Sequence, residues 1–346
     1  MAEAARGGSP AAPRFLLVRL DGIGDALACV PMLEGLLRAH PHAQVGALCS
    51  PANATLFSKR VERVHIFDRG AAVEALVPEL RRAAYTHALV ATEEVVGYQL
   101  ARVAGAPHRA GFWHGLDKPF KSLWQFSQLT DRVYRPAAWT SRPEHEVEAL
   151  YRLALAFGAR PPAPDEVDAL RTWLAIEPLA PGPGARVALG FQITGKMASG
   201  GWGPDALARL CEAAHGASGS PELALIAAPG DEGLARALME DLTSSVRERA
   251  HLVPPGRVPQ WLGAIDSLAA LVTPDTGAAH AAGMLGVPVI DIFDGPRFDQ
   301  LSRQWRPWAA PHRCVVKPVA GDGVPEQFGA ELGTAVAQLR ALDPRR

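Results

Sequence analysis

Residues 271–295 read LVTPDTGAAHAAGMLGVPVIDIFDG, and this pattern predicts a parallel α/β unit. Two apolar runs, Leu268–Thr273 and Val287–Phe293, have the length and β-branched content of buried parallel strands. The alanine- and leucine-rich segment Gly277–Leu285 between them favours a short helix, which Gly286 would end. The order strand, helix, strand is typical of an open parallel sheet with helices packed on its faces.

Four residues of this unit fall where the first strand ends and the helix begins: Asp275, Thr276, Gly277 and His280. In an open α/β sheet, ligands bind at the carboxyl ends of the strands, and free N–H groups in a helix's first turn suit a phosphate. Asp275 and Thr276 would also serve as simple helix caps. His280 on the same turn favours a ligand site, because a cap has no use for an imidazole.

The composition limits the class of protein. The 346 residues suffice for two domains with hydrophobic cores, and a hydrophobic content of 48% indicates a globular chain. The 35 Lys and Arg nearly balance the 36 Asp and Glu, for a formal net charge of −1. This balance argues against nucleic acid as the main partner.

Targeting and redox signals indicate a cytoplasmic protein. No apolar run reaches the ~18 residues of a membrane span. Residues 1–13 lack the apolar core of a signal peptide, so we expect them to form a disordered tail. The four cysteines are scattered without metal-binding spacing, as expected for reduced thiols.

The beginning of the folded region repeats the strand-then-helix order. A predicted strand at Arg14–Leu20 leads into the loop DGIGD, which contains Gly22 and Gly24. Two glycines are too few for the GxGxxG dinucleotide fingerprint. The loop instead places Asp25 at a helix N-terminus above a strand end, where it is either a site carboxylate or a helix cap.

Strands and helices alternate through the rest of the chain, which predicts a doubly wound, mainly parallel sheet in each half. The other predicted strands are 44–49, 64–67, 88–91, 108–112, 187–191, 222–227 and 251–253. The other predicted helices are 26–39, 71–84, 95–104, 143–158, 165–174, 203–214, 232–248 and 327–342. A Pro/Gly-rich stretch marks the best domain boundary. The predicted domains are a tail at 1–13, a Rossmann-like domain at 14–177, a linker at 178–185, a second Rossmann-like domain at 186–325 and a terminal helix at 326–346.

Residues 113–142 interrupt this alternation with a long stretch that has no clear periodicity. The stretch mixes six aromatic residues with Lys118, Lys121, Arg132 and Arg135. Such long irregular segments are usually functional or mobile, and this mixture would suit a sugar-bearing ligand, either neutral or anionic. The alternative is a packed excursion whose basic residues extend to solvent.

Two motifs carry a resemblance to a known family. VRLDGIGDALACVPML (residues 18–33) and PDTGAAHAAGMLGVPVIDIFDGP (residues 274–296) resemble the opening motif and the donor-site signature of glycosyltransferase family 9, the ADP-heptose:lipopolysaccharide heptosyltransferases. Weaker likeness lies at residues 100–112, 145–158 and 228–232. The resemblance implies a GT-B fold, in which two Rossmann-like domains face a central cleft. The N-terminal domain would hold the acceptor and the C-terminal domain the nucleotide-sugar donor, with no bound metal or other cofactor.

The resemblance also implies roles for individual residues. Asp25 matches the proposed catalytic base, which would take the proton of the acceptor hydroxyl as the anomeric carbon inverts. Asp275 would hold sugar or ribose hydroxyls, and Glu232 matches a ribose-binding position. The remaining donor-binding positions, which would neutralise the leaving diphosphate, are Thr276, the backbone N–H groups of Gly277, Ala278 and Ala279, and His280.

Two departures from the family pattern concern the cation beside the diphosphate. The family usually carries a basic residue one or two positions before a tryptophan, but Gly200 and Gly201 precede Trp202. The nearest basic residue is Lys196, which either curls back to the phosphates or is a solvated loop lysine. The second departure follows Gly295–Pro296, where the family tends to have Thr and a short acidic turn, whereas this chain has Arg297, a second candidate for the phosphate charge.

The leading expectation is an inverting, metal-independent transfer of a heptose or related sugar from ADP-heptose to a lipopolysaccharide-core-type glycolipid. The enzyme would be bacterial and cytoplasmic, with peripheral contact at the inner membrane. Four alternatives remain open: a family 9 enzyme with a protein or small-molecule acceptor, a GT-B nucleotide-sugar 2-epimerase, a Rossmann oxidoreductase, and a silent binding protein. The missing GxGxxG disfavours the oxidoreductase, and Asp25 disfavours the silent protein.

Overall fold

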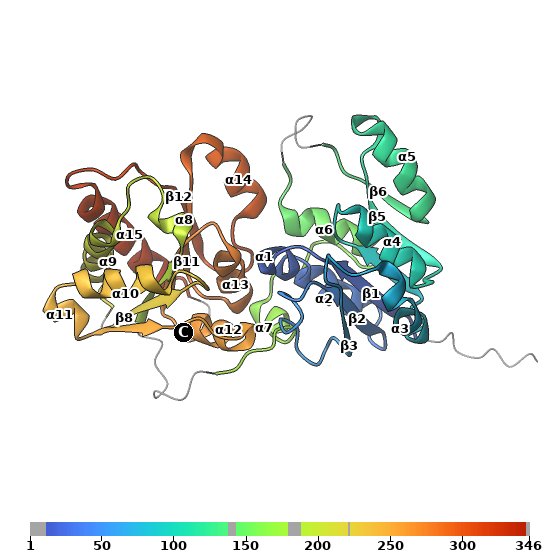
Figure 1. Ribbon diagram of the computed structural model, residues 1–346, viewed down its shortest axis with the longest axis horizontal. Coiled ribbons are helices and arrows are strands. Elements are labelled where there is room, and N and C mark those ends of the chain that lie inside the picture. Colours follow the sequence, from blue (N-terminus) through green and yellow to red (C-terminus); the bar gives the residue numbers. More distant parts are fainter. Residues whose placement is uncertain (1–11, 138–142, 179–187, 221, 344–346) are drawn as a thin grey trace, which may run out of the picture.

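The molecule contains two six-stranded sheets, and each sheet forms the centre of one half of the chain (Figure 1). The structure is a computed structural model that describes residues 12–137, 143–178, 188–220 and 222–343. The strand orders are β3-β2-β1-β4-β5-β6 and β12-β11-β10-β7-β8-β9, and every strand pair is parallel. The predicted pair of doubly wound parallel α/β domains is confirmed.

The first sheet comprises β1 (Arg14–Arg19), β2 (Gln44–Cys49), β3 (Arg63–Ile66), β4 (His87–Val90), β5 (His108–Trp113) and β6 (Asp131–Tyr134). The second comprises β7 (Ala188–Ile193), β8 (Glu222–Ala227), β9 (Ala250–Val253), β10 (Ala270–Pro274), β11 (Val289–Phe293) and β12 (His312–Val316).

The helices of the N-terminal domain are α1 (Ile23–Leu27), α2 (Val30–Ala39), α3 (Val77–Arg82), α4 (Val95–Val103), α5 (Pro119–Gln128), α6 (Glu146–Leu155) and α7 (Val167–Arg171), with 3-10 turns η1 (Val73–Leu76) and η2 (Gly115–Asp117). Those of the C-terminal domain are α8 (Gly195–Ala198), α9 (Pro204–Ser218), α10 (Glu232–Asp241), α11 (Ser244–Arg247), α12 (Val258–Asp266), α13 (Gly277–Leu285), α14 (Phe298–Trp305) and α15 (Val324–Arg340), with the 3-10 turn η3 (Gly295–Arg297).

Strand β1 shows why these apolar runs form central strands. Its side chains alternate between two separate hydrophobic clusters: Phe15 and Leu17 belong to one, and Leu16 and Val18 to the other. All four are fully buried. A strand that is apolar on both faces is stable only where helices cover both sides of the sheet, as they do here.

The predicted helix 26–39 is wrong as one element, because the structure has α1 and α2 there. Helix α1 begins earlier, at Ile23, and ends before α2 begins at Val30. Pro31 lies in the first turn of α2, where its missing N–H costs no hydrogen bond. The predicted helix 232–248 is likewise divided, into α10 and α11.

Residues 113–142 are more regular than the sequence predicted. Helix α5 and strand β6 occupy 119–128 and 131–134, and β6 extends the parallel sheet beside β5. Residues 138–142 lie outside the described residues. Helix α14 and strand β12 were also not predicted.

The predicted strand–helix–strand unit at residues 268–293 is confirmed. Helix α13 spans Gly277–Leu285, and Gly286 ends it in the left-handed conformation (φ 71°). Strands β10 and β11 flank α13 in the sequence and pair with each other in parallel in the sheet.

The two domains contact each other through several polar links. Arg171 of α7 forms an ion pair with Asp266 of α12, and it donates to the Leu285 carbonyl at 3.2 Å. His145 Nε2 lies 2.8 Å from the Arg306 carbonyl oxygen. The predicted linker, apart from Pro178, lies outside the described residues, so its boundaries stay a prediction.

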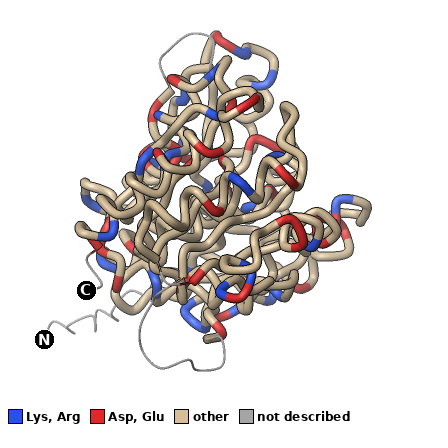
Figure 2. Tube along the Cα trace, turned by 90° about the vertical axis from the view of Figure 1, so that its left-hand side faces the viewer, with Lys and Arg blue, Asp and Glu red and all other residues tan. Residues whose placement is uncertain are grey.

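Charge is spread evenly over the surface. On the face that Figure 2 shows, Lys and Arg are interspersed with Asp and Glu, in keeping with the near-zero net charge. Among the described residues, no helix combines the length and the apolarity that a bilayer crossing requires.

Candidate active site

A cleft of about 660 Å³ lies between the two domains and collects most of the predicted site residues. The predicted residues that line it are Gly22, Gly24, Asp25, Asp275, Thr276, Gly277, Ala278 and His280. Three predicted residues do not line it. Ala279 is buried inside α13, Glu232 lies at the start of α10, and Lys196 lines a neighbouring cavity.

Asp25 is held in place by Arg19, a residue whose role the sequence did not reveal. The Arg19 guanidinium lies 2.6 Å from Asp25 Oδ1 and 3.1 Å from Asp21 Oδ2, and it also donates to the Ala91 carbonyl. Asp25 Oδ2 accepts the Gly22 N–H at 3.2 Å. Asp25 therefore is a helix cap, as the alternative interpretation held, and it also presents a carboxylate of fixed orientation to the cleft.

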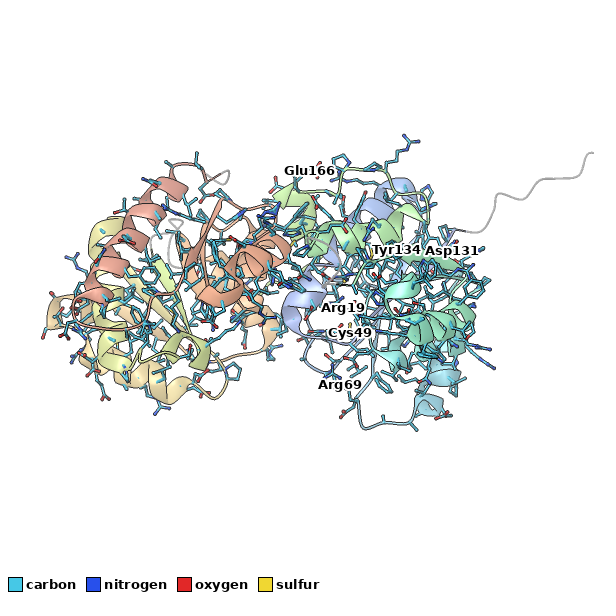
Figure 3. All side chains as sticks on the ribbon, turned by 90° about the horizontal axis from the view of Figure 1, so that it is seen from above. Arg19, Cys49, Arg69, Asp131, Tyr134 and Glu166 are labelled. Carbon is cyan, nitrogen blue, oxygen red and sulfur yellow. The ribbon has the colours of Figure 1, made fainter. Side chains whose placement is uncertain are left out.

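Arg19 reaches this position from the end of a central strand. Its side chain is only 6% exposed, whereas that of Asp25 is 30% exposed. Figure 3 shows Arg19 on the side of the N-terminal domain that faces the C-terminal domain. The cation is thus buried behind the carboxylate, and the carboxylate is the group that a ligand in the cleft would meet.

Helices α1 and α13 meet at the cleft with very little space between them. A Cβ atom at Gly24 would lie 2.7 Å from His280 Cδ2 and 3.3 Å from the Gly277 Cα atom. Glycine is therefore required at position 24 by the close approach of the two domains.

The N-terminus of α13 has its own internal hydrogen bonds. Thr276 Oγ1 accepts the Ala278 N–H at 3.4 Å, and the Thr276 carbonyl accepts the Ala279 N–H at 3.1 Å. The Gly277 N–H is the first-turn donor that neither bond uses. The positive end of the helix dipole at this point favours an anion in the cleft.

His280 is neutral at physiological pH. Burial, with a smaller contribution from nearby His145, lowers the pKa of His280 to about 4. Its ring meets the Trp305 ring edge-on, with 5.6 Å between centroids. His280 can therefore offer a hydrogen bond to a ligand in the cleft, but it brings no positive charge.

Lys196 does curl back to the DTG turn. Its Nζ donates to the Asp275 carbonyl at 2.5 Å and lies 3.5 Å from Asp275 Oδ2. Burial raises the pKa of Asp275, and Lys196 counteracts that shift. Gly200 and Gly201 have φ angles of 72° and 85°, so the glycines that replace the usual basic residue allow the chain to turn sharply after Lys196.

Three cations gather in the neighbouring cavity of about 350 Å³: Lys196, Arg297 and Lys317. The cavity shares Asp275 with the large cleft. Lys317 Nζ donates to the carbonyls of Lys196 and Met197 at 2.9 and 3.0 Å, so Lys317 fixes α8 and with it Lys196. Lys317 is a further residue that the sequence reasoning missed.

The end of the cleft away from Asp25 is mainly apolar. It is formed by Ala227, Ala228, Pro229, Pro255, Gly256, Val258 and Trp261. Trp261 Nε1 donates to Gln192 Oε1 at 3.2 Å, which fixes the indole ring. A flat aromatic base would fit a slot of this composition. Glu232 lies near this end of the sheet, but the adjacent Asp231 is the residue that bonds the Gly195 N–H, at 3.1 Å.

A smaller cavity, of about 240 Å³, lies on the other side of Asp25. Asp25 and Trp305 line both it and the large cleft. Its other charged residues are Arg19, Asp21, Glu93, Arg135 and Glu146.

Residues from both domains close the small cavity. Arg135 forms a two-point ion pair with Glu146, at 3.2 and 2.6 Å, and Gln304 of α14 donates to the same carboxylate at 3.3 Å. Trp305 belongs to the same helix, so α14 brings the C-terminal domain to the small-cavity side of Asp25. No periodic signal in the sequence could have identified Gln304 or Trp305.

Each of the four basic residues of 113–142 already contacts a carboxylate or an aromatic ring. Lys118 and Lys121 both lie beside Glu93, at 3.2 and 3.3 Å. Arg132 lies over the Phe126 ring, and Arg135 pairs with Glu146 as described. Because Glu93 and Arg135 line the same small cavity, three of the four basic residues lie at or beside it, and a sugar-bearing ligand for 113–142 stays a prediction.

The family model for glycosyltransferase family 9 (heptosyltransferase) matches residues 73–319. The chain belongs to glycosyltransferase family 9. This family 9 chain is therefore a glycosyltransferase, as the resemblance implied. No curated protein sequence shows significant similarity to it.

Solved structures share the fold of this family 9 chain. A glycosyltransferase family 9 protein from Veillonella parvula DSM 2008 is 14% identical, with a TM-score of 0.70 over 95% of this chain and 97% of that one. E. coli ADP-heptose lps heptosyltransferase II is 16% identical, with a TM-score of 0.68 over 94% and 99%. E. coli heptosyltransferase WaaC with ADP-2-deoxy-2-fluoro heptose is 17% identical, with a TM-score of 0.68 over 96% and 100%. The expected GT-B architecture is confirmed.

Proposed function

We propose that this glycosyltransferase moves a heptose or related sugar from ADP-heptose to a hydroxyl of a lipopolysaccharide-core-type acceptor, with inversion and without a metal. One observation carries the proposal: Asp25 of the N-terminal domain and the first turn of α13 line the same cleft. A base and an anion-binding helix terminus on opposite walls are what a nucleotide-sugar transfer requires.

The donor would lie along the C-terminal wall. The apolar slot at Trp261 suits the adenine, and the Gly277 N–H at the end of α13 suits the diphosphate. Lys196, which reaches the carbonyl of Asp275, would supply the positive charge, and Arg297 lines the same cavity. The WaaC neighbour was solved with an ADP-heptose analogue, which supports this donor class.

The chemistry would take place between Asp25 and the donor sugar. The acceptor oxygen forms a bond to the anomeric carbon while the bond from that carbon to the β-phosphate oxygen breaks. The acceptor proton goes to Asp25, and the electron pair of the broken bond stays on ADP. General base catalysis of this kind contributes roughly 10²–10⁴-fold.

Arg19 would act on Asp25 rather than on the substrate. It orients the carboxylate through Oδ1 and leaves the carboxylate on the cleft side of the pair. His280 would donate or accept a hydrogen bond near the leaving phosphate as a neutral ring.

The acceptor would enter on the N-terminal side, through the small cavity beyond Asp25. A glycolipid acceptor implies a cytoplasmic enzyme in peripheral contact with the inner membrane. A family 9 enzyme with a protein or small-molecule acceptor remains the alternative. The 2-epimerase and the oxidoreductase are set aside, because the chain is a glycosyltransferase by family.

A thermal-shift panel of nucleotide sugars tests the donor. We expect stabilisation by ADP and ADP-heptose and none by UDP- or GDP-sugars, and the opposite ranking would contradict the proposal. Asp25→Asn should abolish transfer while ADP binding stays intact. Asp21→Asn, which removes the other carboxylate on Arg19, is the matched control and should retain most of the turnover. An equal loss of transfer activity in both variants would contradict the assignment of Asp25 as the base.

A further inference from the structure

Helix α5 is inverted relative to an ordinary surface helix. Its polar residues Ser122, Gln125 and Gln128 are buried, while Phe120 and Leu123 are 90% and 74% exposed. Hydrogen bonds hold the buried side: Gln125 Nε2 donates to the Tyr98 hydroxyl at 2.9 Å, and Ser122 Oγ accepts the His114 N–H at 3.2 Å, while Gln125 Oε1 has no partner among the described residues. The orientation of the helix is therefore fixed by hydrogen bonds, with its apolar side outward.

The exposed side forms a continuous apolar stripe. Leu116 of η2 is 92% exposed and Phe126 of α5 is 54% exposed. Within α5, Phe120, Leu123 and Phe126 recur at intervals of three residues, which places them along one side of the helix, and Leu116 lies in the turn just before it. We call these four residues the α5 apolar row. Single exposed apolar residues are ordinary, but a contiguous group of this size marks an interaction surface.

The beginning of the helix that carries the row lies near the small cavity on the proposed acceptor side of the site. Lys118 and Lys121, from the start of the same helix, reach Glu93, which lines that cavity. Helix α5 itself lies at the outer rim of the N-terminal domain, away from the C-terminal domain (Figure 1). Asp131 and Tyr134 of the following strand also lie farther out than Arg19 (Figure 3). The row therefore lies beside the acceptor side without covering it.

The charges around the row cancel. Glu93 stands beside Lys118 and Lys121, and Arg132 lies over the Phe126 ring, 3.7 Å from its centroid. Asp117 of η2 and Asp131 of β6 supply two further carboxylates. The three carboxylates balance the three cations, so the residues around the row have no net charge. Electrostatic attraction to an anionic membrane is therefore not expected for this part of the surface.

We propose that the α5 apolar row inserts into the surface of a lipid bilayer and thereby holds the small cavity next to a membrane-borne acceptor. None of the four side chains lines the large cleft, the small cavity or the cavity at Lys196. Projecting Phe and Leu side chains with cations alongside are typical of interfacial helices. A bilayer that carries the acceptor also leaves the neighbouring cavity accessible to it. The assignment rests on the proposed function only in that the acceptor is a lipid.

Vesicle co-sedimentation of the full chain tests the proposal. The probes are vesicles of phosphatidylcholine alone and of phosphatidylcholine with phosphatidylglycerol, each at low and at high NaCl. The variants are Phe120→Ser/Leu123→Ser and, as a matched control, Val319→Ser, which removes an apolar residue that is 80% exposed in the other domain.

We expect the wild type and the control to bind both vesicle types with little salt dependence. The double variant should lose about tenfold or more in partitioning for each side chain removed. No vesicle binding by the wild type, or equal binding by the double variant, would overturn the proposal. Binding confined to anionic vesicles and lost at high salt would also overturn it, because that result assigns the contact to charge. A wild-type dimer that the double variant abolishes, without vesicle binding, would assign the row to a second copy of the chain.

Two readouts separate this proposal from the proposed function. The melting temperature and the ADP-induced thermal shift should be the same in the double variant and the wild type, since the row lies outside the cleft. Transfer to a water-soluble acceptor should also be unchanged, whereas transfer to an acceptor embedded in vesicles should fall with binding. If no nucleotide sugar binds at all, the proposed function fails, while vesicle binding still decides the role of the row.

Discussion

A methyl group at position 24 would test the contact on which the cleft depends. In Gly24→Ala, the new Cβ atom would lie 2.7 Å from His280 Cδ2 and 3.3 Å from the Gly277 Cα atom. Real Cβ atoms essentially never approach a neighbour within 3.0 Å. His280 is buried and packs against Trp305, and the Gly277 atom belongs to the backbone, so neither yields unless α1 and α13 separate.

We expect the clash in Gly24→Ala to destabilise the folded protein by about 1–3 kcal/mol, the usual effect of overpacking. Gly233→Ala is the matched control, because Gly233 is also the second residue of a helix, α10, and a Cβ atom there meets nothing within 4 Å. Both variants gain the same helix propensity from alanine, up to about 1 kcal/mol. Their difference therefore isolates the clash. For domains of this size it corresponds to a melting temperature roughly 2–12 °C lower in Gly24→Ala than in the control.

The assay is a thermal melt of both variants with and without ADP, together with the dissociation constant for ADP. We expect Gly24→Ala to melt lower and to bind ADP more weakly, because Gly277 and His280 line the cleft. If Gly24→Ala melts and binds ADP like the control, the two helices can separate at no cost. In that case the close contact does not shape the site.

Three further predictions concern charged and buried groups. Lys196→Met should weaken ADP binding about tenfold by removing the cation beside Asp275. An unchanged dissociation constant for ADP would show that Lys196 is a solvated loop lysine that does not contact the phosphates. Burial lowers the pKa of His145 and of His280 to about 4, so only the unfolded chain takes up these protons between pH 6.5 and 4. Stability should therefore fall as the pH falls through that window, by about 1.4 kcal/mol per pH unit for each ring, and His280→Gln should flatten the melting profile there. Asp291 is fully buried, neither carboxylate oxygen has a hydrogen-bond partner among the described residues, and burial raises its pKa. The folded state then keeps this proton longer than the unfolded state, so stability is lost as the pH rises above about 3.9. Asp291→Val should accordingly raise the melting temperature at pH 8, and a lower one would show that the carboxylate has a stabilising partner.

Strands and helices could be predicted from the sequence where local patterns and tertiary packing agree. Strands β1, β10 and β11 are apolar runs with clear boundaries, and α13 ends at Gly286 as its pattern indicates. In α5, Phe120, Leu123 and Phe126 have helical spacing, but the sequence cannot reveal that this apolar side faces outward, because the usual relation between hydrophobicity and burial is reversed there. Helix α14 has Phe298, Leu301 and Trp305 at helical spacing, but its position depends on contacts with the other domain, such as the bond from Gln304 to Glu146. No local pattern encodes a contact of that kind.

The same distinction holds for the site. Asp25 and the DTGAAH turn could be found because each lies at the junction of a strand and a helix, which local sequence reveals. The partner of Asp25 could not, because Arg19 is a strand residue whose charge is buried only in the folded chain. Lys196 was a candidate, but whether its chain turned back depended on the φ angles of Gly200 and Gly201.

Trp305 forms part of the wall of both the large cleft and the small cavity. A ligand on either side that shifts this indole changes the shape that the other ligand meets. Thermodynamic linkage makes such an effect mutual: the factor by which the nucleotide sugar alters acceptor affinity equals the factor by which the acceptor alters nucleotide-sugar affinity. One aromatic ring, supplied by a helix of the C-terminal domain that contacts the N-terminal domain, would thus be enough to make the two binding equilibria interdependent.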